Sequence, residues 1–349
     1  MKNVRFDNSG SEPVFRFENT DGVDDRIVYK PSTRGLKPEL RKEDFSVELL
    51  INPFLNRAKN VYNICKDDRD SSTGREGVIF PVSALDTEDS FEQTGMCNYA
   101  LIAFQILLER LEEVENSERD FSDNFEDNVC VCVINLKSLG IANPLHLCIN
   151  SLRKYGYSYF EPNNEIKKVD GYKAELYVDN SVRNLKVKFE EPLLYSNSMV
   201  DMMLRALPHA NNVIHRFVLL YQVIETMMED VSLKKINEEI DKLQNNLVPH
   251  NDFLDSLKGI GQEKERIKEI FNICHLSNSE FLCFKDPCLK LYSLTKYSPD
   301  KPSEKALLFY SFRNQMTHTF RSLHDYPDEV AETVQGFEKV VLTILEKYK

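Results

Sequence analysis

The stretch that decides the fold of the second half of this chain is SEKALLFYSFRNQMTHTFRSL, residues 303–323. Its apolar residues recur at helical spacing and form one stripe on a helix: Phe309, Phe312, Met316, Phe320 and Leu323. Ser303 and Glu304 suit the cap and first turn of such a helix. The stretch therefore predicts an amphipathic helix that packs one face into a core.

Three polar residues accompany this stripe. Arg313 lies at its edge, while Asn314 and His318 share the neighbouring face because they are four residues apart. On an ideal helix Arg313 and His318 are separated by about 140°. We therefore expect that one helix by itself does not bring both to a single phosphate, and that two copies packed around a twofold axis would do so. The spacing favours a homodimer.

The rest of residues 196–349 also has helical character. We expect long amphipathic helices over 211–243 and 328–348, one or two helices within 250–273, and a shorter helix over 279–294 that breaks at Pro287. These elements predict an all-α, antiparallel helical bundle.

The first 195 residues instead mix strand and helix patterns, so we expect an α+β domain at 1–195 followed by the helical domain at 196–349. The expected strands are 15–19, 26–30, 77–85 as far as Pro81, and 128–139, the last being the most apolar. Helices are expected over 98–115 and 144–157. Residues 45–66 should begin as a strand and continue as a helix after Pro53, and 174–180 and 184–190 should form a hairpin.

The composition is that of an acidic globular protein. Among 349 residues the formal net charge is −12, and 42 % are hydrophobic. No run approaches 18 apolar residues and the first residues lack the apolar core of a signal peptide, so we expect no membrane partner and a cytoplasmic location. The eight cysteines include no CxxC pair and the histidines lack ligand spacing, so we expect no metal, and neither a P-loop nor another cofactor motif is present.

The polar trio suits RNA cleavage without a metal ion, because the 2′-OH of RNA can itself attack the adjacent phosphate. His318 would act as general acid or base. Arg313 would stabilise the phosphorane, and Asn314 would position either His318 or Arg313. Lys305 and Arg321 are expected to bind substrate within a local basic patch that also includes Lys296 and Lys301.

The motif R-N-x-x-x-H, formed by Arg313, Asn314 and His318 on the penultimate helix, resembles that of HEPN domains, and the resemblance covers about residues 200–349. It implies a HEPN-like bundle with metal-independent endoribonuclease activity that leaves 2′,3′-cyclic phosphates, action as a dimer on RNA, and a role in phage defence or as a toxin. The upstream helix over 215–230 is also similar, and we interpret Glu225 within its apolar stripe as a polar partner of the motif.

Two alternatives stay open. The helical domain could be a non-catalytic HEPN-like module for dimerisation or for binding RNA or protein, since some members of that family have lost catalysis. An active site could instead lie in the 1–195 domain, although no motif indicates one. By analogy with other HEPN proteins, that domain would sense a trigger, bind a regulatory protein partner or select the RNA.

Overall fold

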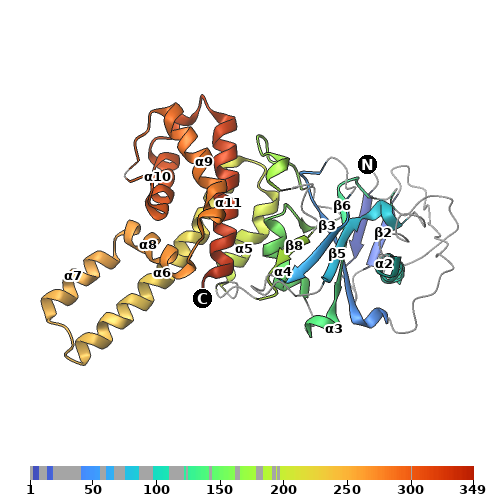
Figure 1. Cartoon of the computed structure of the whole chain (residues 1–349), viewed down its shortest axis with the longest axis horizontal. Helices are drawn as coiled ribbons and strands as arrows, with labels where there is room; N and C mark the ends of the chain where they lie inside the picture. Colours follow the sequence, from blue (N-terminus) through green and yellow to red (C-terminus); the bar gives the residue numbers. More distant parts are fainter. Residues whose placement is uncertain are drawn as a thin grey trace. The chain divides into compact units, whose positions relative to one another are not determined.

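In the computed structural model of this chain, the described residues are 3–7, 14–18, 41–55, 60–66, 75–85, 97–109, 122, 125–140, 144–161, 166–177, 184–190, 194, 197–299 and 301–349. Contacts divide the chain into two units, Met1–Lys167 with Ala174–Glu190, and Lys168–Lys173 with Glu191–Lys349. The first unit holds the main sheet and the second is helical (Figure 1), so the expected α+β class is confirmed.

The first unit is built on a six-stranded sheet in the order β7-β3-β6-β5-β4-β8. Neighbouring strands run antiparallel except β4 and β8, which are parallel. The strands are β3 (Phe45–Ile51), β4 (Tyr62–Lys66), β5 (Arg75–Pro81), β6 (Val129–Asn135), β7 (Ser158–Tyr159) and β8 (Asn184–Val187). A separate two-stranded sheet pairs β1 (Asn3–Asp7) with β2 (Val14–Glu18), which confirms the strand expected at 15–19, whereas the one at 26–30 lies outside the described residues.

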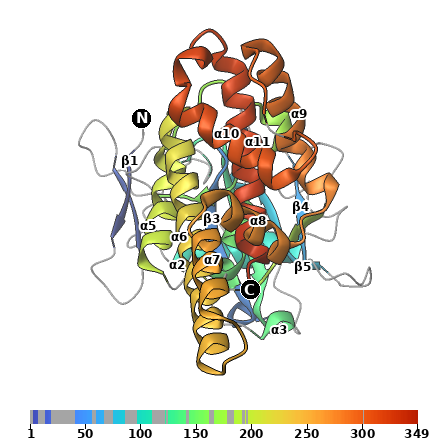
Figure 2. The ribbon, with the colours of Figure 1, turned by 90° about the vertical axis from the view of Figure 1, so that its left-hand side faces the viewer.

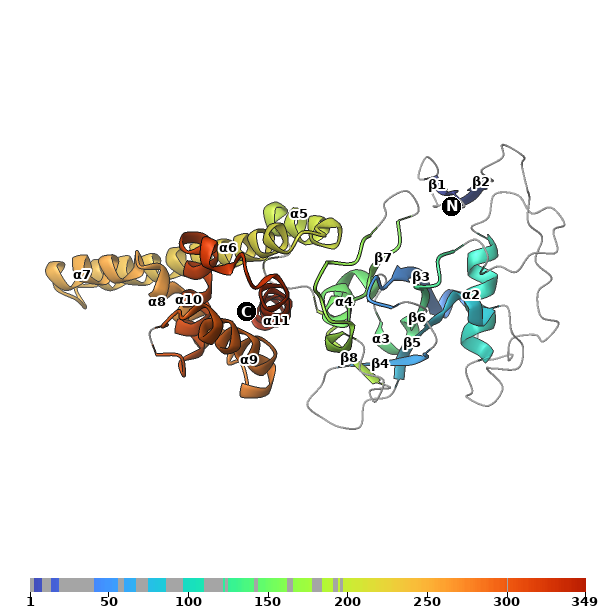
Figure 3. The same ribbon diagram turned by 90° about the horizontal axis from the view of Figure 1, so that it is seen from above.

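Strand β6 is buried on both faces because its sequence, VCVCVIN, is apolar at nearly every position. Val129, Val131 and Val133 face α2 (Cys97–Glu109), whereas Cys130, Cys132 and Ile134 face α4 (Pro144–Arg153). Figure 3 shows these two helices on opposite sides of the sheet. Burial raises the pKa of the Cys130 thiol to about 12, so this cysteine stays protonated and serves as a core residue.

Two local predictions for this unit are wrong. The described residues of 45–66, which are 45–55 and 60–66, form two strands, β3 and β4, and no helix, because alternate residues such as Tyr62 and Ile64 are buried in the sheet. Pro53 lies in the turn after β3, where no ladder needs its missing N–H. The expected hairpin does not form either, since Ala174–Leu176 is a short 3₁₀ helix, η4, and β8 pairs parallel with β4.

The remaining predictions for this unit agree with the structure where it describes the residues. β5 ends at Pro81, α2 reaches Glu109 with residues 110–115 outside the described part, and α4 ends three residues before Gly156. Asn135 ends β6 and caps α3 (Leu136–Leu139), where its side chain accepts hydrogen bonds from the backbone N–H groups of Lys137 and Ser138. The other short 3₁₀ helices are η1 (Lys42–Asp44) and η2 (Val82–Leu85).

The second unit is helical, as expected. Its helices are α5 (Ser198–Ala206), α6 (Val213–Gln244), α7 (His250–Ile260), α8 (Glu263–Cys274), α9 (Asn278–Thr295), α10 (Lys305–His318) and α11 (Pro327–Lys347), with 3₁₀ turns η6 (Leu207–His209) and η7 (Phe320–Leu323). Helix α7 lies along the C-terminal half of α6 (Figure 2). The structure describes every residue of α7, and none of them is fully buried. The described part of the chain contains no helix with the length and apolarity needed to cross a membrane.

An aromatic cluster holds α6, α8, α9, α10 and α11 together. Phe309 on α10 stacks on Phe337 of α11 at 4.4 Å between ring centroids, and Phe284 of α9 meets both edge-on. The α10 stripe predicted from the sequence is buried at Phe309, Phe312, Met316 and Leu323, while the side chain of Phe320 lies outside the described atoms. This packing sets the orientation of α10 and therefore the direction of the polar trio beside the stripe.

The predicted break at Pro287 is wrong, because α9 continues through it from Asn278 to Thr295. Proline at this position leaves the carbonyl of Cys283, four residues earlier, without its intrahelical donor. The backbone of Gly336 on α11 comes so close to Cys283 and Phe284 that any side chain there would collide with them. Close packing between the two helices therefore covers the place where the proline weakens α9.

Candidate active site

Helix α10 places the polar trio at its C-terminal end. The helix ends at His318, five residues before the predicted end, and the chain continues into the 3₁₀ turn η7. Arg313 and Asn314 are half-buried beside the apolar stripe, whereas His318 is exposed. The helix therefore presents an imidazole to solvent next to a guanidinium that is partly enclosed by neighbouring helices.

The side chain of Arg313 contacts both Asn314 and His318. Nη1 of Arg313 donates to Asn314 Oδ1 at 3.1 Å and lies 3.3 Å from Nε2 of His318. Because a guanidinium has donors and no acceptor, Nε2 must be the acceptor in this pair. A hydrogen bond between these two atoms therefore requires the neutral tautomer of His318 that carries its proton on Nδ1.

This contact corrects the expectation that Arg313 and His318 lie too far apart on one helix. Their backbone positions are separated by about 140° on an ideal helix, but the helical wheel leaves out the length of the arginine side chain. The Arg313 side chain crosses the last turn of α10, and α10 ends at His318, so the two groups meet within one chain. The angle between the two residues on an ideal helix therefore no longer favours a homodimer.

Two residues from other helices hold Arg313. Its Nε lies 3.2 Å from Oε1 of Glu263, the first residue of α8, at an ion-pair distance without hydrogen-bond geometry. The ring of Tyr221 on α6 lies 5.5 Å from the guanidinium carbon, and the Tyr221 hydroxyl donates to the same carboxylate oxygen. Burial and this bond to Glu263 raise the pKa of Tyr221 well above its ordinary value, so the phenol stays a donor.

Sequence reasoning missed Glu263 and chose Glu225 instead. Glu225 is exposed and does not lie in the buried stripe of α6, which includes Tyr221, Ile224 and Met228. Glu263 reaches Arg313 only because α8 packs beside α10. The acidic first turn of α8 is visible in the sequence, but nothing in the spacing of residues fifty positions apart indicates this pairing.

The two residues expected to bind substrate lie elsewhere on the second unit. Lys305 is at the first turn of α10, about 12 Å along the helix axis from Arg313, and its Nζ donates to the backbone carbonyl of Leu276 at 2.5 Å. Arg321 is exposed in η7, three residues after His318. Lys296 and Lys301 are also exposed. Of these, Arg321 is the nearest to the trio along the chain.

The chemical capacity of this cluster follows from the remaining donors and acceptors. Within the described part of the chain, Nη2 of Arg313 makes no hydrogen bond, and neither does Nδ1 of His318. The site thus offers two guanidinium N–H groups to an anion and an imidazole that can exchange protons. No group of three or more His, Cys, Asp or Glu side chains with metal-binding geometry occurs among the described residues.

Comparisons with known proteins add nothing to this geometry. No family model matches the chain, and no curated protein or solved structure matches it either.

Proposed function

We propose that this protein is a metal-independent endoribonuclease of the HEPN type, and that its second unit is a HEPN-like bundle. The observation that supports this most directly is the contact of Arg313 with both Asn314 and His318 at the C-terminal end of α10. An arginine fork and a neutral imidazole side by side are the two groups that transesterification of RNA requires.

In the proposed reaction the 2′-oxygen attacks the adjacent phosphorus, the bond to the 5′-oxygen breaks, and the products are a 2′,3′-cyclic phosphate and a 5′-hydroxyl. His318 accepts the proton of the 2′-OH on Nε2. That nitrogen is freed when the scissile phosphate takes over the Nη1 and Nη2 donors of Arg313. Asn314, no longer accepting from Arg313, orients the strand.

The leaving 5′-oxygen needs a proton, and each chain supplies one motif histidine. We propose that RNA is cut by a homodimer, in which His318 of a second copy is protonated and donates that proton from its imidazolium group. The basis is the chemistry of paired acid and base, and the exposure of His318 leaves it accessible to a partner. A cytoplasmic effector of phage defence or a toxin is the biological role that fits such an activity.

The first prediction tests the reaction. Purified protein is incubated with cellular RNA in EDTA, and fragment ends are mapped. We expect cyclic phosphate ends from the wild type, and a fall in rate of about 100-fold or more for both His318→Ala and Arg313→Ala, because each removes a group used in the transition state.

Matched controls separate the site from general charge effects. Arg205→Ala and His250→Ala remove exposed residues of the same types from α5 and α7, and both should cut as the wild type does. If His318→Ala cut RNA at the wild-type rate, the assignment of this residue would be wrong. Growth arrest in cells expressing the wild type, and its loss in His318→Ala, would test the toxin role.

One observation favours a second candidate, a non-catalytic module that binds RNA or protein. Glu263 neutralises Arg313 and, with Tyr221, fixes it in place, which is also how a structural arginine is held. The cleavage experiment distinguishes the two candidates. A non-catalytic module would leave RNA intact in EDTA under every condition and would still bind its RNA or protein partner.

A further inference from the structure

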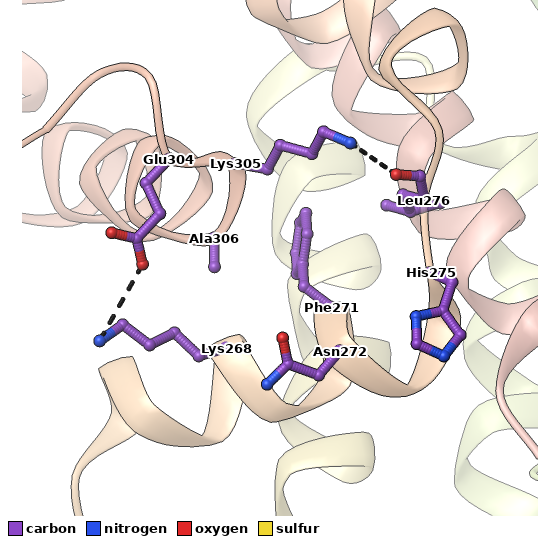
Figure 4. Close-up of a pocket in the computed structure, with 8 residues that line it drawn as sticks. All are labelled: Lys268, Phe271, Asn272, His275, Leu276, Glu304, Lys305 and Ala306. Carbon is purple, nitrogen blue, oxygen red and sulfur yellow. Dashed lines mark hydrogen bonds and ion pairs between the residues drawn. The ribbon is translucent and has the colours of Figure 1, made fainter.

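A pocket of about 500 Å³ lies between α8 and the start of α10 in the second unit. Its volume is within the range of about 300–1,000 Å³ that is usual for small-molecule sites. Lys268, Phe271, Asn272 and His275 line it from the α8 side, and Glu304 and Lys305 from the α10 side (Figure 4). It belongs to the opposite end of α10 from Arg313.

The charged side chains that line the pocket are two lysines and one glutamate, Lys268, Lys305 and Glu304. Lys305 is held by the carbonyl of Leu276, which uses one of the three N–H donors of its ammonium group and leaves two. Lys268 pairs with Glu265 at 2.9 Å and lies 4.0 Å from Glu304, which is too long for a hydrogen bond. Two ammonium groups thus border one space, and the carboxylates of Glu265 and Glu304 both lie next to Lys268.

The same pocket has an aromatic wall and an amide. Phe271 is fixed edge-to-face against Phe281 and Phe309, and the remaining part of its ring borders the pocket. Asn272 is exposed and offers both a donor and an acceptor, as an unpaired base edge requires. Figure 4 shows the Phe271 ring standing between Lys268 and Lys305.

We propose that this pocket binds a nucleoside phosphate, with the base against Phe271 and Asn272 and the phosphate attracted by the ammonium groups of Lys268 and Lys305, which lie on either side of the Phe271 ring. A base needs an apolar, preferably aromatic surface and a hydrogen-bonding edge, and a phosphate needs cations. The pocket supplies all of these from two adjacent helices. Its occupant is either one nucleotide of an RNA strand or a free mononucleotide.

The position of the pocket is compatible with either source. Glu304 lies nine residues from Arg313, about 13 Å along the axis of α10. That distance equals about four stacked nucleotides at about 3.4 Å each, so a strand held at Arg313 could reach the pocket. Binding here requires neither Arg313 nor His318, so the inference stands apart from the proposed cleavage.

The test measures binding by the full chain, using His318→Ala as the background so that no RNA is consumed. Two probes are titrated, adenosine 5′-monophosphate and a short single-stranded 2′-O-methyl RNA. Lys268→Ala and Lys305→Ala should each weaken binding about tenfold, as expected for one charge-assisted contact to phosphate. Glu304→Gln should tighten it several-fold, because the carboxylate opposes the phosphate.

Lys258→Ala is the matched control, since Lys258 is exposed on α7 and pairs with Asp255 there. Should Lys305→Ala disturb the fold through Leu276, Lys268→Ala and Glu304→Gln still decide the matter. Effects on both probes would identify free nucleotide as an occupant, and effects on the RNA probe alone would identify a strand. Binding of neither probe, or binding that the lysine changes leave unaltered, would overturn the proposal, whatever the outcome of the cleavage assay.

Discussion

At the scale of single residues, Arg313 on α10 is contacted by side chains of two other helices, α6 and α8. Its position beside Asn314 and before His318 could be read from the sequence, and so could its place at the edge of an apolar stripe. Its partners Glu263 and Tyr221 could not, because they approach through the packing of α8 and α6 against α10. Nη2 of Arg313 makes no hydrogen bond to the described residues, so it remains available to a phosphate.

The second prediction follows from this arrangement. Glu263→Gln removes the charge that attracts Nε of Arg313 but retains an acceptor for the Tyr221 hydroxyl. We expect the RNA cleavage rate to fall about tenfold, because a less constrained guanidinium loses part of its orientation. Single-turnover cleavage measures this, with Glu229→Gln, an exposed change on α6, as control. An unchanged rate in Glu263→Gln would mean that the carboxylate plays no positioning role.

At the scale of secondary-structure elements, α9 shows how tertiary contacts override local preference. Its proline predicts a break, yet the helix continues because Gly336 lets the backbone of α11 pack against the weakened turn. At its start, Ser277 and Glu280 form a reciprocal capping box, and Lys347 near the end of α11 also donates to Glu280 at 2.7 Å. The contact between α9 and α11 thus depends on single residues at two places, Gly336 and Lys347.

The third prediction concerns Gly336. A methyl group there would come within 2.7 Å of the Cα of Phe284, so Gly336→Ala must separate α9 from α11. We expect a loss of about 3 kcal/mol in the free energy of unfolding. Urea denaturation measures it. Gly259→Ala on α7, where an added methyl meets no described atom within 4 Å, should instead stabilise by up to about 1 kcal/mol. Equal effects of the two changes would contradict this account.

The fourth prediction concerns pH. Burial alone would raise the pKa of Glu280, but hydrogen bonds from Lys347 and Ser277 outweigh it and lower the pKa to about 2 from 4.5. An ionised group with a lowered folded pKa stabilises the protein above its unfolded pKa, and this contribution is lost as pH falls through the folded value. Glu280→Gln should therefore cost about 1–2 kcal/mol at pH 7, after allowance for partial exposure.

Urea unfolding at pH values from 7 down to 3 measures this difference between Glu280→Gln and wild type. It should be constant above about pH 5 and shrink steadily below pH 4.5. Asp255→Asn on α7 is the control, because this carboxylate is 74 % exposed and its pair with Lys258 contributes little at any pH. A difference for Glu280→Gln that did not depend on pH would show that the lowered pKa is not the cause.

At the scale of the whole molecule, the two units are not simply consecutive. The second unit begins at Glu191 and also takes in Lys168–Lys173, a segment that precedes the last strand of the first. In this segment Tyr172 donates to Glu338 on α11, whose carboxylate forms a buried ion pair with Arg216 of α6. Backbone groups of Lys173 exchange hydrogen bonds with the Gln335 side chain. A boundary at 195 and 196 therefore omits part of the second unit.

The fifth prediction uses this segment. Tyr172 is buried, and its ring lies 5.5 Å from the Arg216 guanidinium carbon. Tyr172→Phe should cost about 1 kcal/mol and Tyr172→Ala about 3 kcal/mol. Hydrogen exchange should accelerate in α6 and α11, which belong to the second unit. The exposed neighbour Lys168 provides the control Lys168→Ala. Exchange that accelerated only in strands of the first unit would contradict the assignment of this segment.

The sequence by itself determined the features that depend on local pattern. Apolar periodicity of 3.6 identified α6, α10 and α11, continuous apolar character identified β6, and adjacent polar residues on α10 identified the trio. Prediction from the sequence was wrong where contacts with distant segments determine the local structure. The second strand in 45–66 exists because β5 and β8 pair with it, and α9 persists because α11 covers it. Glu263 meets Arg313 because two helices pack, and no pattern within either helix encodes that contact.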